Sequence, residues 1–297
     1  MSPGITKARK TDIYNDPAFD YGEFWEGRDY EHAAEVIALR RLLRGRRFRA
    51  AVDIGGGYGR LSAILAEYAD QVTLVDPSTQ QLALAERVFP GGLPFTRHLA
   101  DAAHMGLADA SADLVTLIRV LHHLPDPEPE LAELSRILRP GGYAVVEVAN
   151  SVHAARRIRG LLHGRLASAA PVDIRSEESR RNGTAPYVNH HPSTIARQFA
   201  EVGLRPRQVL SVSNLRHPLA KALLPPAAML AIERATQRPL GPLHFGPSVF
   251  FLMQKAAPWL PALNPQSPRR SFRHPQAGDC RPCPATCRRR DRRCPSG

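Results

Sequence analysis

The fold is decided by the stretch Val52-Asp53-Ile54-Gly55-Gly56-Gly57-Tyr58-Gly59-Arg60 and by the shorter run Val72-Thr73-Leu74-Val75-Asp76 that follows it. An apolar strand that enters a glycine turn lets the backbone approach a ligand where a Cβ atom would collide. A second strand that ends in an acid places a carboxylate where it can accept hydrogen bonds from both hydroxyls of a ribose. The two runs together predict a nucleoside pocket.

The spacing of the glycines indicates which kind of nucleoside to expect. A dinucleotide fingerprint has the form G-x-G-x-x-G, in which the third glycine lets the helix pack closely on the strand. Gly55 and Gly57 supply the first two positions, but Arg60 stands where the third glycine belongs and Gly59 comes one residue early. The sequence therefore disfavours a turn that binds a pyrophosphate.

Strand-like and helix-like patterns alternate along the chain. Strands are expected over residues 51–54, 72–75, 95–100, 114–120 and 143–149, and helices over residues 31–44, 61–68, 78–87 and 128–138. Beyond an irregular stretch, a helix is expected over residues 193–201 and strands over residues 208–212 and 248–253. Strands that alternate with helices predict an α/β, doubly wound, Rossmann-like domain with helices on both faces of a parallel sheet.

Polar residues stand at the ends of the next three strands. Asp76-Pro77 follows the second strand, Asp101-Ala102 the third, and Arg119 ends the fourth. Ligands of open α/β sheets bind at the carboxyl ends of the strands, so these residues and the glycine turn are candidate contacts. Each acid also has an ordinary alternative role, a helix cap for Asp76 and a turn residue for Asp101.

Several segments resemble motifs of the class I S-adenosylmethionine-dependent methyltransferases. Asp53, Gly55, Gly57 and Gly59 fit D-x-G-x-G-x-G, which resembles motif I of that family. The segments 120–124 (Val-Leu-His-His-Leu) and 138–142 (Leu-Arg-Pro-Gly-Gly) resemble its sequences at the fourth strand end and before the fifth strand. The matches cover residues 50–150 and are similar to the small-molecule type that includes the ubiquinone and menaquinone biosynthesis enzymes.

The resemblance implies a seven-stranded, mostly parallel sheet whose last strand enters antiparallel between the fifth and sixth positions. It also implies S-adenosylmethionine as cofactor. The glycine turn would lie against the methionine moiety and ribose, Asp76 would hold the ribose hydroxyls, and Asp101 the adenine amino group. Asp53 would support the turn or reach the cofactor's amino group, which the Arg119 carbonyl would also meet. The implied cofactor positions are Asp53, Gly55, Gly56, Gly57, Tyr58, Gly59, Asp76, Pro77, Asp101, Ala102 and Arg119.

Methyl transfer is an in-line displacement for which a protein mainly supplies alignment and exclusion of water. A general base is needed only if the nucleophile arrives protonated. Imidazole titrates near neutrality, which makes His122 and His123 the first candidates, although for at least one of this pair a buried role bonded to the backbone is the alternative. The candidates for a role at the acceptor are His122, His123, Tyr187, His190 and His191.

A small organic molecule is the expected acceptor, and the sequence leaves its identity and the oligomeric state open. Methylation of pyrimidine C5 commonly uses a cysteine nucleophile, and no cysteine precedes residue 280. Methylation of exocyclic base amines usually shows Asn or Asp followed by Pro-Pro and an aromatic residue after the fourth strand, where residues 118–121 read Ile-Arg-Val-Leu. An RNA methyltransferase that uses the Arg-rich segments, and a non-catalytic S-adenosylmethionine-binding module, are the alternatives.

The chain is expected to divide into an N-terminal segment, a methyltransferase domain and a tail. Residues 1–44 would form a lid and a helix, and residues 45–255 the domain. The domain would carry an Arg-rich insert on the substrate side at 151–191 and a helical insert at 215–243. No uncharged apolar run approaches the roughly 18 residues that span a bilayer. The N-terminus lacks the apolar core of a signal peptide, so a cytoplasmic enzyme is expected.

Residues 256–297 are expected to be a disordered Pro/Arg/Cys-rich tail. Much of the net charge of +12 lies there, because residues 269–297 hold nine Arg and two Asp. Four thiolates can bind zinc, but only one C-x2-C pair is present, and an out-of-frame reading of GC-rich DNA is a third interpretation. The cysteines are Cys280, Cys283, Cys287 and Cys294.

Overall fold

The structure is a computed structural model that describes residues 13–15, 25, 27–164, 168–182 and 184–257. The chain divides into two compact units, Met1–Pro258 and Trp259–Gly297. The second unit and its four cysteines lie outside the described residues, so the interpretations of the tail remain predictions.

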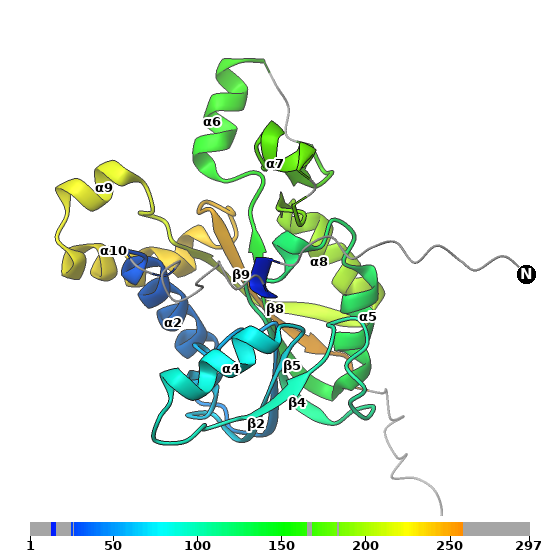
Figure 1. Cartoon of the computed structure of the whole chain (residues 1–297). Helices are drawn as coiled ribbons and strands as arrows, with labels where there is room; N and C mark the ends of the chain where they lie inside the picture. The colour runs from blue at the N-terminus through cyan, green and yellow to red at the C-terminus, as the bar shows by residue number, and fades with distance from the viewer. Residues whose placement is uncertain (1–12, 16–24, 26, 165–167, 183, 258–297) are drawn as a thin grey trace, which may run out of the picture. The chain divides into compact units, whose positions relative to one another are not determined.

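A seven-stranded sheet of order β3-β2-β1-β4-β5-β9-β8 organises the first unit (Figure 1). Strands β1 to β5 pair in parallel, whereas β9 runs antiparallel to both β5 and β8. This arrangement confirms the expected doubly wound sheet, including the antiparallel last strand. The strands are β1 (Phe48–Ile54), β2 (Ala69–Asp76), β3 (Thr96–Leu99), β4 (Ala112–Leu117), β5 (Leu138–Ala149), β8 (Leu204–Val212) and β9 (Ser248–Lys255).

The strands are apolar on both faces because helices cover both faces. Strand β9 shows this, since Phe250 and Leu252 belong to one core and Val249, Phe251 and Met253 to the other. Successive side chains of a strand point to opposite faces, so this alternation fixes the register of the strand.

Helices from both ends of the domain sequence build the first core. Helices α2 (Asp29–Leu43), α3 (Ser62–Leu65) and α4 (Thr79–Val88) contribute to it, and α10 (Pro226–Leu240) packs on α2 and β8. The second core is formed with α5 (Glu128–Ile137) and α8 (Pro192–Glu201).

The helix expected over residues 61–68 is shorter in the structure, where α3 spans Ser62–Leu65. Regular α-helix is confined to α3, because Glu67 and Tyr68 donate their amides to the carbonyls of Ile64 and Leu65, three residues back. Such bonds tighten the chain into 3₁₀ geometry. The tighter turn lets β2 begin directly at Ala69.

The remaining helices and strands lie in two insertions, and two short 3₁₀ segments lie elsewhere in the domain. Between β5 and α8 come α6 (Ala154–Leu162), α7 (Glu177–Arg181) and a small sheet of β6 (Val172–Asp173) and β7 (Val188–Asn189). Helix α9 (Pro218–Leu223) precedes α10. Short 3₁₀ segments, η1 (Ile13–Asn15) and η2 (Leu121–His123), lie before α2 and after β4. Figure 1 shows α6 and α7 standing away from the seven-stranded sheet.

A buried carboxylate joins α2 to α10. Glu233 has no exposed surface and accepts hydrogen bonds from the Tyr30 hydroxyl at 2.7 Å and from the amides of Ser213 and Asn214 at 2.8 and 3.0 Å. The Gln237 side-chain amide donates a further bond at 3.1 Å. Four donors compensate the loss of water around the charge. These bonds fix the start of helix α2 against α10.

We expect Tyr30→Phe to lower the free energy of unfolding by about 1.5–3 kcal/mol, the usual worth of a hydrogen bond to a charged group. The substitution removes one donor from Glu233 and the acceptor of the Leu215 amide, which lies 3.0 Å from the Tyr30 oxygen. Urea unfolding followed by circular dichroism measures the loss. Tyr143→Phe is the control, since no hydrogen bond of that hydroxyl occurs within the described residues. Equal effects of the two substitutions would contradict the role of Glu233.

Candidate active site

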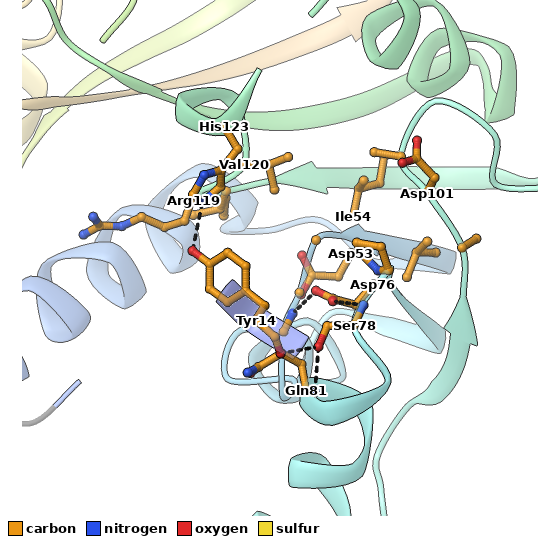
Figure 2. A pocket seen from close by; sticks show the side chains of 18 of the residues that line it. Tyr14, Asp53, Ile54, Asp76, Ser78, Gln81, Asp101, Arg119, Val120 and His123 are labelled. Carbon is orange, nitrogen blue, oxygen red and sulfur yellow. Dashed lines mark hydrogen bonds between the residues drawn. The ribbon is translucent and has the colours of Figure 1, made fainter. Parts of the chain in front are cut away.

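A cavity opens at the carboxyl ends of β1, β2 and β4 (Figure 2). The sequence-predicted cofactor residues gather around it, with one exception: Gly59 is not part of the lining. A side chain at Gly59 would collide with the ring of Phe95, so this glycine allows close packing behind the turn. The predicted residues that line the cavity are Asp53, Gly55, Gly56, Gly57, Tyr58, Asp76, Pro77, Asp101, Ala102 and Arg119.

Asp53 lies directly before the glycine turn and is buried. Its carboxylate is 2% exposed and accepts hydrogen bonds from the hydroxyls of Ser62 at 2.7 Å and Thr116 at 2.6 Å. Burial raises the pKa of Asp53, and the two hydroxyl donors oppose that rise. These bonds tie β1 to β4 and to α3, which is the supporting role among the two that the sequence allowed.

Asp76 connects the second strand to the same turn. One carboxylate oxygen accepts the amide of Gly57 at 2.8 Å, and the other accepts the amide of Ser78 at 2.9 Å. The cap of the following helix is Ser78, whose hydroxyl accepts the amide of Gln81 at 3.1 Å. The alternative role of Asp76 as the cap is thus taken by its neighbour, and Asp76 faces the cavity.

Two arginines of the cavity wall meet one buried glutamate of α2. Arg60 and Arg119 each place a guanidinium nitrogen 2.6 Å from an oxygen of Glu35, which has no exposed surface. The indole of Trp25 covers the pair, with Arg60 3.8 Å and Arg119 5.5 Å from its ring centroid. Figure 2 shows the Arg119 side chain directed away from Asp76 and Asp101.

The two arginines keep the Glu35 carboxylate ionised although it is buried. Burial acts to raise the pKa of Glu35, but Arg119 and Arg60 outweigh it and hold the pKa below its usual value. The backbone of Arg119 adopts a positive φ of 64° and donates its amide to buried Glu147 at 3.2 Å. Burial raises the pKa of Glu147, although Arg119 opposes the rise. Arg119 therefore bonds one acid through its side chain and another through its backbone.

Sequence reasoning missed Glu35 and used Arg60 only to set aside a dinucleotide site. The sequence did contain one indication, because the helical spacing places Glu31 and Glu35 on the same face as Ala34 and Ala38. In the structure all four residues are buried. An acid on the apolar face of a helix is a candidate for a buried ion pair.

Two buried polar atoms of the cavity lining have no hydrogen-bond partner among the described residues. The side-chain oxygen of Gln81 and one carboxylate oxygen of Glu130 are buried and accept no hydrogen bond in the part of the chain that the structure describes. Burial and the neighbouring Asp101 raise the pKa of Glu130. Asp101 also accepts the amide of Ala103 at 2.8 Å, as a turn residue would. Buried polar atoms normally have partners, so these two oxygens point to a ligand that supplies hydrogen-bond donors.

Of the five acceptor-side candidates, His123 lines the cavity. Its Nε2 atom lies 2.8 Å from the hydroxyl of Tyr14, and its Nδ1 atom 3.3 Å from the carbonyl of Pro186 (Figure 2). The rings of His122 and Tyr187 pack beside it, with centroids 4.0 and 5.5 Å away. Burial, with His123 and Arg119 nearby, lowers the pKa of His122 well below its usual value, so His122 is neutral.

His122, Tyr187, His190 and His191 are outside the cavity lining. His190 is 2% exposed and donates a hydrogen bond from Nε2 to the carbonyl of Leu121 at 2.9 Å. His191 caps α8 by accepting the amide of Ser193 at 3.2 Å. These two histidines thus bond the backbone and do not line the cavity.

Comparison with known proteins identifies the family. Residues 52–146 match the family described as a methyltransferase domain. The ubiquinone biosynthesis O-methyltransferase of Aromatoleum aromaticum is 30% identical over 168 residues, which cover 56% of this chain and 68% of that protein. The chain belongs to the class I S-adenosylmethionine-dependent methyltransferases.

Solved structures share the fold of this methyltransferase. An S-adenosylmethionine-dependent methyltransferase from Thermotoga maritima superposes with a TM-score of 0.54 at 18% identity, covering 79% of this chain and 94% of its own. The N-methyltransferase NodS of Bradyrhizobium japonicum, solved with S-adenosyl-L-homocysteine, has a TM-score of 0.52 at 14% identity, covering 82% and 96%.

The cavity of the methyltransferase fits S-adenosylmethionine, its cofactor. The glycine turn leaves room for a ligand against the backbone, and a side chain at Gly55 would collide with Val120. The unpartnered oxygens of Gln81 and Glu130 can accept the amino hydrogens of a purine. When bound, the cofactor supplies a methyl group attached to a sulfonium sulfur. The rest of the cofactor is the leaving group and becomes a neutral thioether.

Two further findings bear on the sequence expectations. No helix among the described residues is both long and apolar enough to cross a membrane. The same residues contain no group of three or more His, Cys, Asp or Glu side chains placed to hold a metal ion. The cysteines of the tail lie outside the part searched.

We expect Asp76→Ala to raise the Kd for S-adenosylmethionine about ten- to a hundredfold, because the turn loses the acceptor of the Gly57 amide and the cofactor loses the predicted ribose contact. Isothermal titration calorimetry measures the change. Asp70→Ala is the matched control: Asp70 lies at the other end of β2 and pairs with Arg47 on the surface. An affinity that Asp76→Ala leaves unchanged would rule out the ribose role.

We expect Glu35→Gln to cost about 3–5 kcal/mol of folding free energy, because two largely buried guanidinium groups lose their counter-charge. Glu67→Gln is the control, since Glu67 pairs with Arg40 at the same 2.6 Å but both side chains are about half exposed. That change should cost under about 1 kcal/mol. Urea unfolding compares the two variants, and similar costs would show that Glu35 is not a supporting charge.

Proposed function

We propose that this methyltransferase methylates a hydroxyl group of a small organic acceptor and that His123 takes the proton of that hydroxyl. The carrying observation is the position of His123, which lines the cofactor cavity and contacts a hydroxyl, that of Tyr14, through Nε2. The name of the Aromatoleum relative, an O-methyltransferase of ubiquinone biosynthesis, supports a hydroxyl acceptor.

The hydrogen bonds of His123 favour the tautomer that a base needs. The carbonyl of Pro186 can only accept, so Nδ1 carries the proton and donates it toward that oxygen. Nε2 then keeps its lone pair and accepts from the Tyr14 hydroxyl. An acceptor hydroxyl in place of Tyr14 would meet the same lone pair, at hydrogen-bond distance from the base.

Segments outside the core motifs supply the acceptor side in this proposal. Tyr14, from the 1–44 segment, lines the cavity, and its carbonyl accepts the Ser78 hydroxyl at 2.7 Å, which supports a lid over the cofactor. Ala185, from the 151–191 insert, lines the same cavity, which supports an insert on the substrate side. The domain proper would be residues 45–255, with residues 215–243 as a helical insert.

We expect His123→Ala to lower kcat about 10²- to 10⁴-fold, the usual contribution of a positioned base, with little change in cofactor affinity. The assay follows methyl transfer from labelled S-adenosylmethionine to catechol-type phenols such as 3,4-dihydroxybenzoate. His163→Ala is the control, because His163 is an exposed residue after α6.

Unchanged turnover in His123→Ala would remove the base from the proposal. Methylation confined to acceptors without a hydroxyl would overturn the proposed acceptor class. Calorimetry of cofactor binding, carried out on the same variant, separates a loss of chemistry from a loss of the pocket.

A further inference from the structure

Helix α6 presents its apolar side to solvent. Ile158, Leu161 and Leu162 are 60%, 76% and 79% exposed, and no residue of the helix is buried. A surface helix ordinarily turns its apolar stripe toward the protein. The apolar side of α6 therefore lacks a partner among the described residues.

The exposed side chains form one continuous stripe. Ile158, Leu161 and Leu162 are spaced by three and four residues, which places them on one face of an α-helix. Arg156, Arg157 and Arg159 occupy the rest of the circumference, and the helix contains no acidic residue. Helix α6 is thus strongly amphipathic, with an aliphatic face bordered by arginines.

The loop after α10 also exposes apolar side chains. Leu243 and Phe245 are 57% and 38% exposed. The loop adjoins the start of α6, since the Ala154 amide donates to the Phe245 carbonyl and the Arg157 guanidinium to the Leu243 carbonyl, both at 2.8 Å. Two segments far apart in sequence thus present exposed apolar side chains beside one another.

The polar side of α6 is positively charged. None of its three arginines, Arg156, Arg157 and Arg159, forms an ion pair with any described residue. Burial lowers the pKa of His153 at the start of the helix, and the α6 arginines and Arg216 lower it further. The patch therefore favours an occupant that is apolar and negatively charged together.

We propose that α6 and the adjoining loop after α10 form an interfacial surface that docks the enzyme on an anionic lipid bilayer. A Leu-rich face with arginines along its borders is the pattern of a helix that lies in a membrane interface. The aliphatic face enters the acyl boundary, and the arginines meet the lipid phosphates.

Charge complementarity disfavours the other occupants. The chain's own tail carries nine Arg and two Asp over residues 269–297, so it repels the arginines of α6. A second copy of the chain brings the same positive patch. A nucleic acid satisfies the charge but leaves Leu161 and Leu162 in water. A lipid surface satisfies both.

Lipid docking does not depend on the proposed hydroxyl acceptor, but it affects which acceptors can reach the cavity. The insert that carries α6 also supplies Ala185 to the cavity, so the docked enzyme holds its acceptor side on the element that touches the lipid. Acceptors dissolved in the bilayer then become accessible. The test below reads lipid binding rather than turnover, so its outcome is separate from that of the His123 experiment.

The test is cosedimentation of the full chain with vesicles of equal phosphatidylglycerol and phosphatidylcholine, and with vesicles of phosphatidylcholine alone, at about 0.1 M salt. We expect binding to the anionic vesicles only, weakened about tenfold or more by the double substitution Leu161→Glu and Leu162→Glu. The matched control is Leu219→Glu with Leu223→Glu on α9, where the side chains are equally exposed at 65% and 78%. All four positions face solvent, so the variants should fold as the wild type does.

Three results would overturn the proposal. If the α6 variant still bound vesicles and high salt abolished that binding, the attraction would come from charge elsewhere in the chain, such as the tail. A wild-type dimer that the α6 variant converts to a monomer, without vesicle binding, would assign the patch to a second copy. RNA binding that the α6 variant leaves intact, again without vesicle binding, would assign the arginines to nucleic acid.

Discussion

Glu35 is a carboxylate without exposed surface, and it stays ionised because two guanidinium groups reach it from different parts of the cavity wall. Removing such a charge from water costs more than a single ion pair usually returns. Arg60 follows the glycine turn and Arg119 lies two residues beyond the end of β4, so one side chain of α2 contacts both. The wall around the predicted methionine end therefore depends on a helix that precedes the Rossmann sheet.

The rest of the cavity is organised by acids whose first partners are protein groups. Asp53 accepts hydrogen bonds from two hydroxyls, which ties β1 to β4 and α3, and Asp76 accepts two backbone amides, one of which ties the glycine turn to β2. A carboxylate can accept about four hydrogen bonds, so Asp76 can hold the turn and accept from a ligand as well. Groups held in this way need little rearrangement when a ligand enters, which limits the entropy lost on binding.

The insert between β5 and α8 differs from the core in its physical character. Its inner residues contact the cavity and the ring of His123, while α6 directs aliphatic side chains outward. The same insertion thus offers contacts both to a small acceptor and to a larger surface. The strand ends of the seven-stranded sheet carry most of the predicted cofactor residues, and the insertion between β5 and α8 carries Ala185 and α6.

The sequence by itself determined the sheet, the glycine turn and the acids Asp53 and Asp76, because these depend on neighbours close in the chain and on the rule that parallel strands end at one edge. It did not locate Glu35, Gln81 and Glu130, which reach the cavity from helices whose placement depends on packing. Nor did it sort the histidines, since a cavity contact at His123 and a backbone contact at His190 look alike in a pattern. Only the tertiary structure decided these roles, and the outward face of α6, because burial and charge pairing are properties of residues distant in sequence.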